Sequence, residues 1–285
     1  MEATRPNAVR LCAPERRQAA VKIHKPGRKD NLMHFLFAAD TDIGISKKNN
    51  QDSVLVKHAA STKGEVLLAV ICDGMGGLSK GELASATVIK AFSKWFDEEL
   101  SRELENPDMY VIGNKWALML KELNGRILEY GRQNSVSLGT TFSGILFADD
   151  KYVIAHVGDS RVYHLSSSLS QLTTDQTFIA REIAAGRMTK EQARTDRRRN
   201  MLLQCVGASK AVEPEILTGK AAAGGYLLCS DGFRHVNTPE EIYAAFSPAL
   251  AWDKDNMRLQ IRKMIDQAMQ REERDNISAI YIKLE

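Results

Sequence analysis

The chain has 285 residues, 44% of them hydrophobic, and its 39 Lys and Arg nearly balance its 36 Asp and Glu, which describes a globular protein and excludes global disorder. A net charge of +3 gives no overall argument for nucleic acid or an anionic membrane as a partner, and four widely spaced cysteines suggest neither a zinc ribbon nor a disulfide framework. The apolar runs are far shorter than the roughly 20 residues that cross a bilayer, and the N-terminus has no signal-peptide pattern, so we expect a cytoplasmic protein without a membrane span.

The beginning of the chain differs from the rest in charge and pattern. Residues 1–31 carry eight Lys or Arg against three acids and show little periodicity. This composition indicates a basic, loosely ordered arm before a single domain of residues 32–285. A solvated tail without a specific role is one interpretation of the arm, and contact with nucleic acid is another.

Short apolar runs bounded by Gly, Asp, Asn or Ser predict strands, because their length and β-branched content suit extended segments. The predicted strands are residues 34–39, 53–56, 66–72, 141–148, 152–157, 161–165, 225–230 and 277–284. Only "ADDK" and "GDS" separate the central runs, which indicates an antiparallel meander. The same observation argues against a receiver domain, which requires parallel βα alternation.

Two amphipathic stretches before the central strands predict helices. The first begins at Ser79, where Ser79 and Glu82 form a capping box. Its expected buried stripe consists of Leu83, Ala86, Ile89, Ala91, Trp95 and Phe96. The second helix covers about residues 114–132.

Two more helices are predicted before the last strand. One begins at Thr238, with Pro239 at its first position and Glu241 completing a capping box, and the other covers about residues 257–269. The apolar stripe of the latter is Ile261, Met264, Ile265 and Ala268. These elements predict an α+β fold of stacked antiparallel sheets covered by helices, with the Arg-rich residues 175–210 as an inserted flap.

Aspartates stand where several predicted strands begin or end, namely at Asp52, Asp73, Asp159, Asp231 and Asp275. A single Asp in such a place is usually a turn former or a helix cap, and spacing alone does not establish that the strand ends converge. If they do converge, carboxylates without accompanying His or Cys are hard oxygen ligands. Such a cluster selects Mg²⁺ or Mn²⁺ over zinc or copper.

A series of motifs resembles the metal-dependent serine/threonine phosphatases of the protein phosphatase 2C family, in their compact bacterial form. In chain order they are "TDIGISKKNNQDS", "AVICDGMGG", "GTTFSGIL", "HVGDSRVYHL", "LTTDQT", "LLQCVGA", "LCSDGF" and "RDNISAIYI", between about Phe35 and Leu284. The resemblance implies an α-β-β-α sandwich that hydrolyses phosphoserine and phosphothreonine in proteins. It also implies phosphoprotein substrates, opposition to a Ser/Thr kinase, no nucleic acid and a monomer.

The resemblance assigns a centre of two Mn²⁺ or Mg²⁺ ions to the aspartates. Asp73 would bridge the ions, the Gly74 carbonyl would join the second, Asp231 and Asp275 would hold the first, and Asp52 would act through a bound water. A hydroxide bridging the two ions would then attack the phosphate in line. The four aspartates among these residues are the predicted catalytic residues.

The remaining assignments include departures from the family pattern. Asp159 and Asp231 would form a weaker third-metal site, as in bacterial relatives. Lys47 stands where the family usually has a phosphate-binding Arg, and it supplies a point charge without the bidentate fork. Gln176 replaces a His of the flap, and Arg234 stands where a small or acidic residue is common, so the third site is the property most open to question.

Three functions compete at this point. The first is the phosphoprotein phosphatase. The second is a catalytically weak phospho-binding or regulatory module on the same fold, which Lys47 and Gln176 suggest and which the retention of all five aspartates disfavours. The third is a metal-dependent nuclease that uses the basic arm, for which a salt-dependent affinity for nucleic acid would be the evidence.

Overall fold

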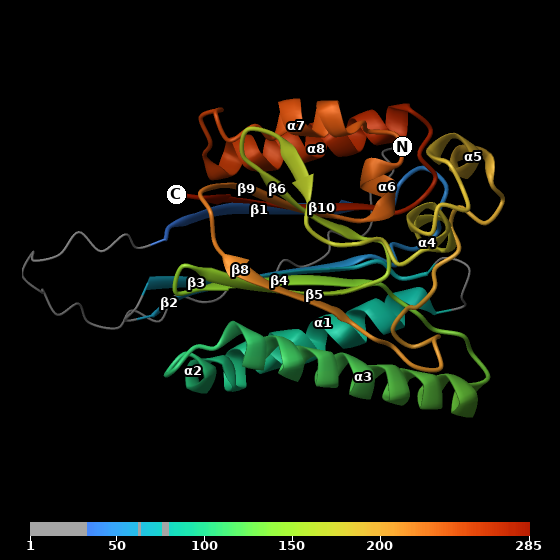
Figure 1. The fold of residues 1–285 in the computed structure, drawn as a ribbon, viewed down its shortest axis with the longest axis horizontal. Helices are drawn as coiled ribbons and strands as arrows, with labels where there is room; N and C mark the ends of the chain where they lie inside the picture. Colours follow the sequence, from blue (N-terminus) through green and yellow to red (C-terminus); the bar gives the residue numbers. More distant parts are fainter. Residues whose placement is uncertain (1–32, 62–63, 76–79) are drawn as a thin grey trace, which may run out of the picture. The chain divides into compact units, whose positions relative to one another are not determined.

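The computed structural model describes residues 33–61, 64–75 and 80–285 (Figure 1). The predicted basic arm, residues 1–31, and the predicted helix cap at Ser79 lie outside these residues. No helix in the described part is long and apolar enough to span a membrane.

Two five-stranded antiparallel sheets stack face to face, and helices cover both outer surfaces (Figure 1). The first sheet has the order β1-β10-β9-β6-β7, formed by Phe35–Asp42, Ile277–Leu284, Gly224–Cys229, Arg161–Leu165 and Leu169–Gln171. The second has the order β2-β3-β4-β5-β8, formed by Ser53–Ser61, Gly64–Cys72, Phe142–Ala148, Lys151–Val157 and Glu215–Lys220. The α+β sandwich expected from the sequence is confirmed.

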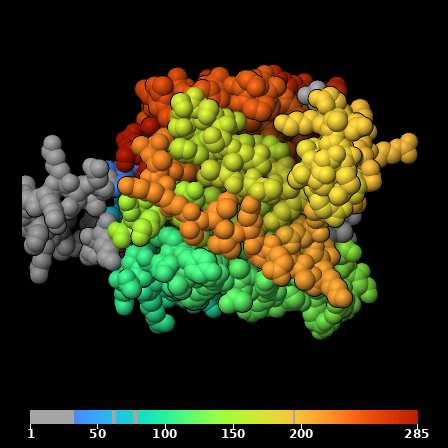
Figure 2. Space-filling model, in the orientation of Figure 1, coloured from blue at the N-terminus to red at the C-terminus, as the bar shows by residue number. Residues whose placement is uncertain are grey.

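The helices form one layer on each outer surface and a group at one end (Figure 1). The layer on the second sheet consists of α1 (Gly81–Glu98), α2 (Leu100–Glu103) and α3 (Met109–Asn134), and the layer on the first of α7 (Pro239–Ala245) and α8 (Lys254–Gln270). The end group is α4 (Phe178–Ala184), α5 (Lys190–Thr195) and α6 (Asp231–Arg234). Helices α4 and α5 belong to the predicted flap, which projects in yellow at this end in Figure 2.

Local capping explains where two of the helices start. The Thr238–Glu241 capping box at the start of α7 is present as predicted. Helix α3 begins several residues before the predicted start, because the Asp108 carboxylate accepts hydrogen bonds from the backbone N–H groups of Tyr110 and Val111.

The central meander was predicted incorrectly. Strands β4 and β5 form a hairpin, but β5 belongs to the second sheet and β6 to the first. The "GDS" segment therefore crosses between the sheets. Gly158 has φ +107°, and a Cβ there would lie 2.7 Å from the Thr141 side chain, so only glycine permits this crossing.

Helix α1 confirms the predicted stripe in part, because Trp95 is buried and Ile89, Ala91 and Phe96 pack against the core at its margin. Leu83 is exposed, and the buried positions are Gly81, Ala84, Ser85, Val88, Phe92 and Trp95. Two strands were also missed. Strand β7 has three residues, and β8 is a partly buried edge strand without a continuous apolar run.

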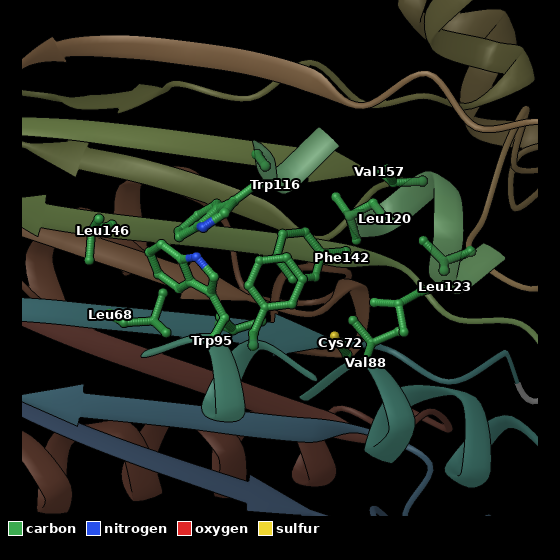
Figure 3. Close-up of a cluster of buried hydrophobic side chains, with 14 of the residues drawn as sticks. Leu68, Cys72, Val88, Trp95, Trp116, Leu120, Leu123, Phe142, Leu146 and Val157 are labelled. Atoms are coloured by element: carbon green, nitrogen blue, oxygen red, sulfur yellow. The ribbon is translucent and has the colours of Figure 1, made fainter. Parts of the chain in front are cut away.

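Strand β3 has a continuous apolar sequence because both of its faces are covered. Its residues Leu68, Val70 and Cys72 belong to the hydrophobic cluster beneath α1 and α3, whereas Leu67 and Ile71 lie between the sheets. In the first cluster the indole rings of Trp95 and Trp116 (Figure 3) meet edge to face with centroids 5.3 Å apart. The ring centroid of Phe92 lies 5.2 Å from that of Trp116.

We expect Trp116→Ala to lower the free energy of unfolding by about 3–5 kcal/mol, because it removes a fully buried indole and leaves a cavity. Leu118→Ala, on the same helix and 68% exposed, is the matched control and should change it by less than about 0.5 kcal/mol. Urea unfolding followed by far-UV circular dichroism measures both. Equal losses from the two variants would contradict this packing.

Candidate functional site

The five predicted aspartates lie where their strands begin or end. Asp52 precedes β2, Asp73 follows β3, Asp159 lies in the β5–β6 crossing, Asp231 begins α6 and Asp275 precedes β10. Burial and then the charges of the other four aspartates raise the pKa of Asp73 well above its usual range. The fold therefore places all five carboxylates close enough to repel one another.

Asp52 and Asp159 are the two buried residues among these aspartates, and Asp52 has the following contacts. Its Oδ2 accepts a hydrogen bond of 2.6 Å from the Ser278 hydroxyl, and its Oδ1 is buried without a partner. Burial raises the pKa of Asp52 to about 7; the Ser278 hydrogen bond opposes this rise, and the charge of Asp231 adds to it. The Oδ1 atom of Asp231 is likewise buried without a partner.

The backbone around Asp73 is fixed by two threonines and by close packing at Gly74. The Asp73 N–H donates to the Thr141 hydroxyl at 2.9 Å, and the Asp73 carbonyl accepts from the Thr140 hydroxyl at 3.0 Å. A Cβ on Gly74 would lie 2.4 Å from the Gln51 carbonyl oxygen, so no other residue fits. The end of β3 is thus held rigidly at the cluster.

Cations of the protein itself pair with the outer carboxylates. Lys47 Nζ lies 2.7 Å from Asp275 Oδ1, and Arg234 Nη2 lies 3.2 Å from Asp159 Oδ2. His235 Nε2 lies 3.4 Å from Asp231 Oδ2. Within residues 33–61, 64–75 and 80–285, no three Asp, Glu, His or Cys side chains are already arranged to hold a metal ion.

The centre nevertheless fits divalent cations. Its possible ligand atoms are carboxylate oxygens, and two of them, on Asp52 and Asp231, are buried without a partner. The other aspartates raise the pKa of Asp73, which indicates that nearby cations do not fully compensate the negative charge of the cluster. Ions that bind Asp275 would replace the ammonium of Lys47, whose side chain is 27% exposed. The expected third metal site, at Asp159 and Asp231, differs from Asp275. The cation that pairs with Asp159 is Arg234, whose side chain is only 13% exposed.

Several residues that support the site were missed by the sequence interpretation. Glu273 Oε1 accepts hydrogen bonds from the backbone N–H groups of Arg274 and Asp275, and the other oxygen lies 3.4 Å from His235. Asn276 joins the segment that carries Lys47, since its Nδ2 donates to the Ile43 carbonyl. The only sequence signal was their proximity to "RDN" and "SDGF".

Gln176, the residue in place of a family His, has a structural contact that the sequence did not indicate. Its Oε1 accepts from the Gly158 backbone N–H at 2.8 Å and from Gln204 Nε2 at 2.8 Å. It therefore anchors the flap to the crossing segment that carries Asp159. This contact explains the amide without invoking a loss of catalytic function.

Comparison with known sequences decides the family. The sequence model described as protein phosphatase 2C matches residues 45–271. The chain belongs to the protein phosphatase 2C family. The resemblance inferred from the motifs is thereby confirmed.

Curated relatives in the family carry phosphatase names. The serine/threonine protein phosphatase PstP of Mycobacterium tuberculosis is 35% identical over 212 residues, which cover 73% of this chain and 38% of that protein. The chain thus matches well under half the length of this relative. The protein phosphatase PhpP of Streptococcus pneumoniae is 29% identical over 206 residues, which cover 71% of this chain and 80% of that protein.

Solved structures share the fold. The serine/threonine phosphatase Stp1 from Staphylococcus aureus has a TM-score of 0.77 and 25% identity, and the match covers 92% of this chain and 99% of that one. The catalytic domain of PstP in complex with two manganese ions has a TM-score of 0.71 and 29% identity, covering 88% of this chain and 99% of that one.

We expect the metal-free protein to lose stability as the pH rises from about 4 to about 7. The folded pKa values of Asp52, about 7, and Asp159, about 6, lie above the ordinary value of 3.8. The folded state therefore holds more protons than the unfolded state in this window, and the free energy of unfolding should fall as the pH rises through it. Urea unfolding at several pH values, with a chelator present to keep the protein free of metal, measures this free energy.

Asp52→Asn should flatten this pH dependence, whereas Asp266→Asn, at a half-exposed position on α8, should retain it. A metal-free stability that rises steadily through the window would show that the aspartates are not crowded as described.

Proposed function

We propose that this chain is a Mn²⁺- or Mg²⁺-dependent protein phosphatase that releases phosphate from phosphoserine and phosphothreonine in proteins. The observation that carries the proposal is the cluster of five mutually repelling aspartates, with buried, unpartnered oxygens on Asp52 and Asp231. Membership of the protein phosphatase 2C family and the phosphatase names of the relatives support it.

Four aspartates and one backbone carbonyl would hold the ions. Asp73 and the Gly74 carbonyl, Asp231 and Asp275 would be direct ligands, and Asp52 would act through water. When bound, a pair of divalent ions lowers the pKa of the attacking water and screens the negative charge of the phosphate. The PstP structure, which is in complex with two manganese ions, supports a centre of two ions.

Lys47 would bind the substrate phosphate. It already lies beside Asp275, and although burial opposes the change, the hydrogen bond and charge of Asp275 raise the pKa of its ammonium, which keeps it cationic. Once Asp275 binds an ion, Lys47 loses that partner and its charge becomes available to the phosphate. A single ammonium binds as a point charge, so we expect it to contribute to affinity more than to orientation.

A cysteine nucleophile has no place in this proposal. The three described cysteines, Cys72, Cys205 and Cys229, are all buried. Burial raises the pKa of the Cys72 thiol and raises that of Cys229 to about 12. Neither thiol would be the thiolate that a cysteine phosphatase needs.

The proposed substrates are phosphorylated proteins, and a Ser/Thr kinase would supply them. A cytoplasmic location, a monomeric state, the separate arm of residues 1–31 and the flap of residues 175–210 remain predictions from the sequence. The regulatory-module alternative loses one of its two reasons, because Gln176 has a structural role.

Asp73→Ala and Asp231→Ala should each lower phosphate release at least about a hundredfold, because they remove ligands of the ions that supply the nucleophile. The assay follows release from a phosphothreonine peptide and from p-nitrophenyl phosphate during a Mn²⁺ titration. Asp97→Ala, on the exposed side of α1, is the control and should behave like the wild type. An inactive wild type at saturating Mn²⁺ would refute the phosphatase and leave the regulatory module.

Lys47→Ala should raise KM more than it lowers kcat, because Lys47 holds the substrate and does not form the nucleophile. The exposed neighbour Lys48 provides a matched control, and Lys48→Ala should leave both constants nearly unchanged. A loss confined to kcat would place Lys47 in the chemical step and contradict the assigned role.

A further inference from the structure

Arg234 occupies an unusual position beside the aspartate cluster. It ends α6, three residues after Asp231, and its side chain is turned inward and only 13% exposed. Its Nη2 donates to the Asp159 carbonyl at 2.9 Å and to Asp159 Oδ2 at 3.2 Å. The guanidinium therefore donates hydrogen bonds to both the backbone and the side chain of Asp159, the residue expected to hold a third metal ion.

The neighbouring acid, Asp175, is bound more closely by another guanidinium. Asp175 is held by Arg161, whose Nε and Nη2 donate to its two carboxylate oxygens at 2.8 and 2.6 Å. Arg234 lies 3.9 Å from the same carboxylate. Two buried acids thus face two cations, with Arg161 assigned to Asp175 and Arg234 to Asp159.

This arrangement leaves no unpaired charge for a divalent ion at Asp159. An ion there would have to displace Arg234 from its closest carboxylate and leave a largely buried guanidinium with only the longer, 3.9 Å contact to Asp175, which is unfavourable. Arginine does not lose its proton inside proteins, so it would not escape the penalty by becoming neutral. The residues present therefore do not fit a third metal ion.

We infer that Arg234 is a fixed cation in place of a third metal ion, so that the centre binds about two ions and Asp159 is a partner of Arg234 and not a metal ligand. The inference rests on the proposed function, because it concerns the same metal centre. It corrects the expectation that Asp159 and Asp231 form a weak third site. The positive charge at this corner then depends neither on metal concentration nor on pH.

The test counts the Mn²⁺ ions bound per chain, from the electron paramagnetic resonance signal of the free ion during a titration. The wild type should bind about two. Arg234→Ser should free Asp159 and add one weaker site, and the double variant Arg234→Ser/Asp159→Asn should lose it again. Arg161→Gln, which removes the adjacent guanidinium that pairs with Asp175, is the matched control and should add no site.

A wild type that binds three ions, or an Arg234→Ser variant that still binds two, would overturn the inference. If Arg234→Ser does not fold, Asp159→Asn in the wild-type background decides the matter. The count should stay at two if Asp159 is not a ligand, and a lower count would show that it is one. A wild type that binds no Mn²⁺ at all would instead refute the proposed function, which keeps the two failures apart.

Discussion

Electrostatic repulsion among the aspartates at one end of the sandwich is the constraint on which the site depends. Two like charges about 5 Å apart repel by roughly 3 kcal/mol at the effective dielectric constant typical near a protein surface. Such a cluster persists only if a rigid scaffold holds it together. The continuous core beneath α1 and α3, between the sheets and under α8 provides that scaffold, and bound cations or basic side chains provide the compensating charge.

The sequence predicted correctly those features that depend on residues close together in the chain. Strands bounded by Asp and Gly, the Thr238 capping box and the apolar stripe of α8 follow from short-range rules, and the structure has them. It was uninformative about the choice of sheet. A three-residue connection is compatible with a hairpin, and only the folded chain shows that it crosses between the sheets, where Gly158 leaves no room for a Cβ beside Thr141. The buried face of α1 was similarly decided by packing, because apolar residues occur on both of its sides.

The aspartates themselves could be predicted, but the partners of their carboxylates could not. Asp52 bonds to Ser278, and Asp159 bonds to Arg234, across 226 and 75 positions of sequence respectively. Contacts at such separation have no local pattern. The ligand assignments came from family motifs, whereas the knowledge that one corner is closed by a guanidinium came only from the folded structure.

Lys47 and Arg234, the two basic residues that pair with the aspartates, differ in how far they are exposed to solvent. Lys47 is 27% exposed on a segment that is hydrogen-bonded to Asn276, and its proposed role requires the ammonium to move from Asp275 to a phosphate. Arg234 is enclosed, bonds to both the carbonyl and the carboxylate of Asp159, and cannot leave without stranding a charge. The ion pair at Asp275 is therefore the one that we propose to exchange with metal and substrate, whereas we infer that the ion pair at Asp159 is retained.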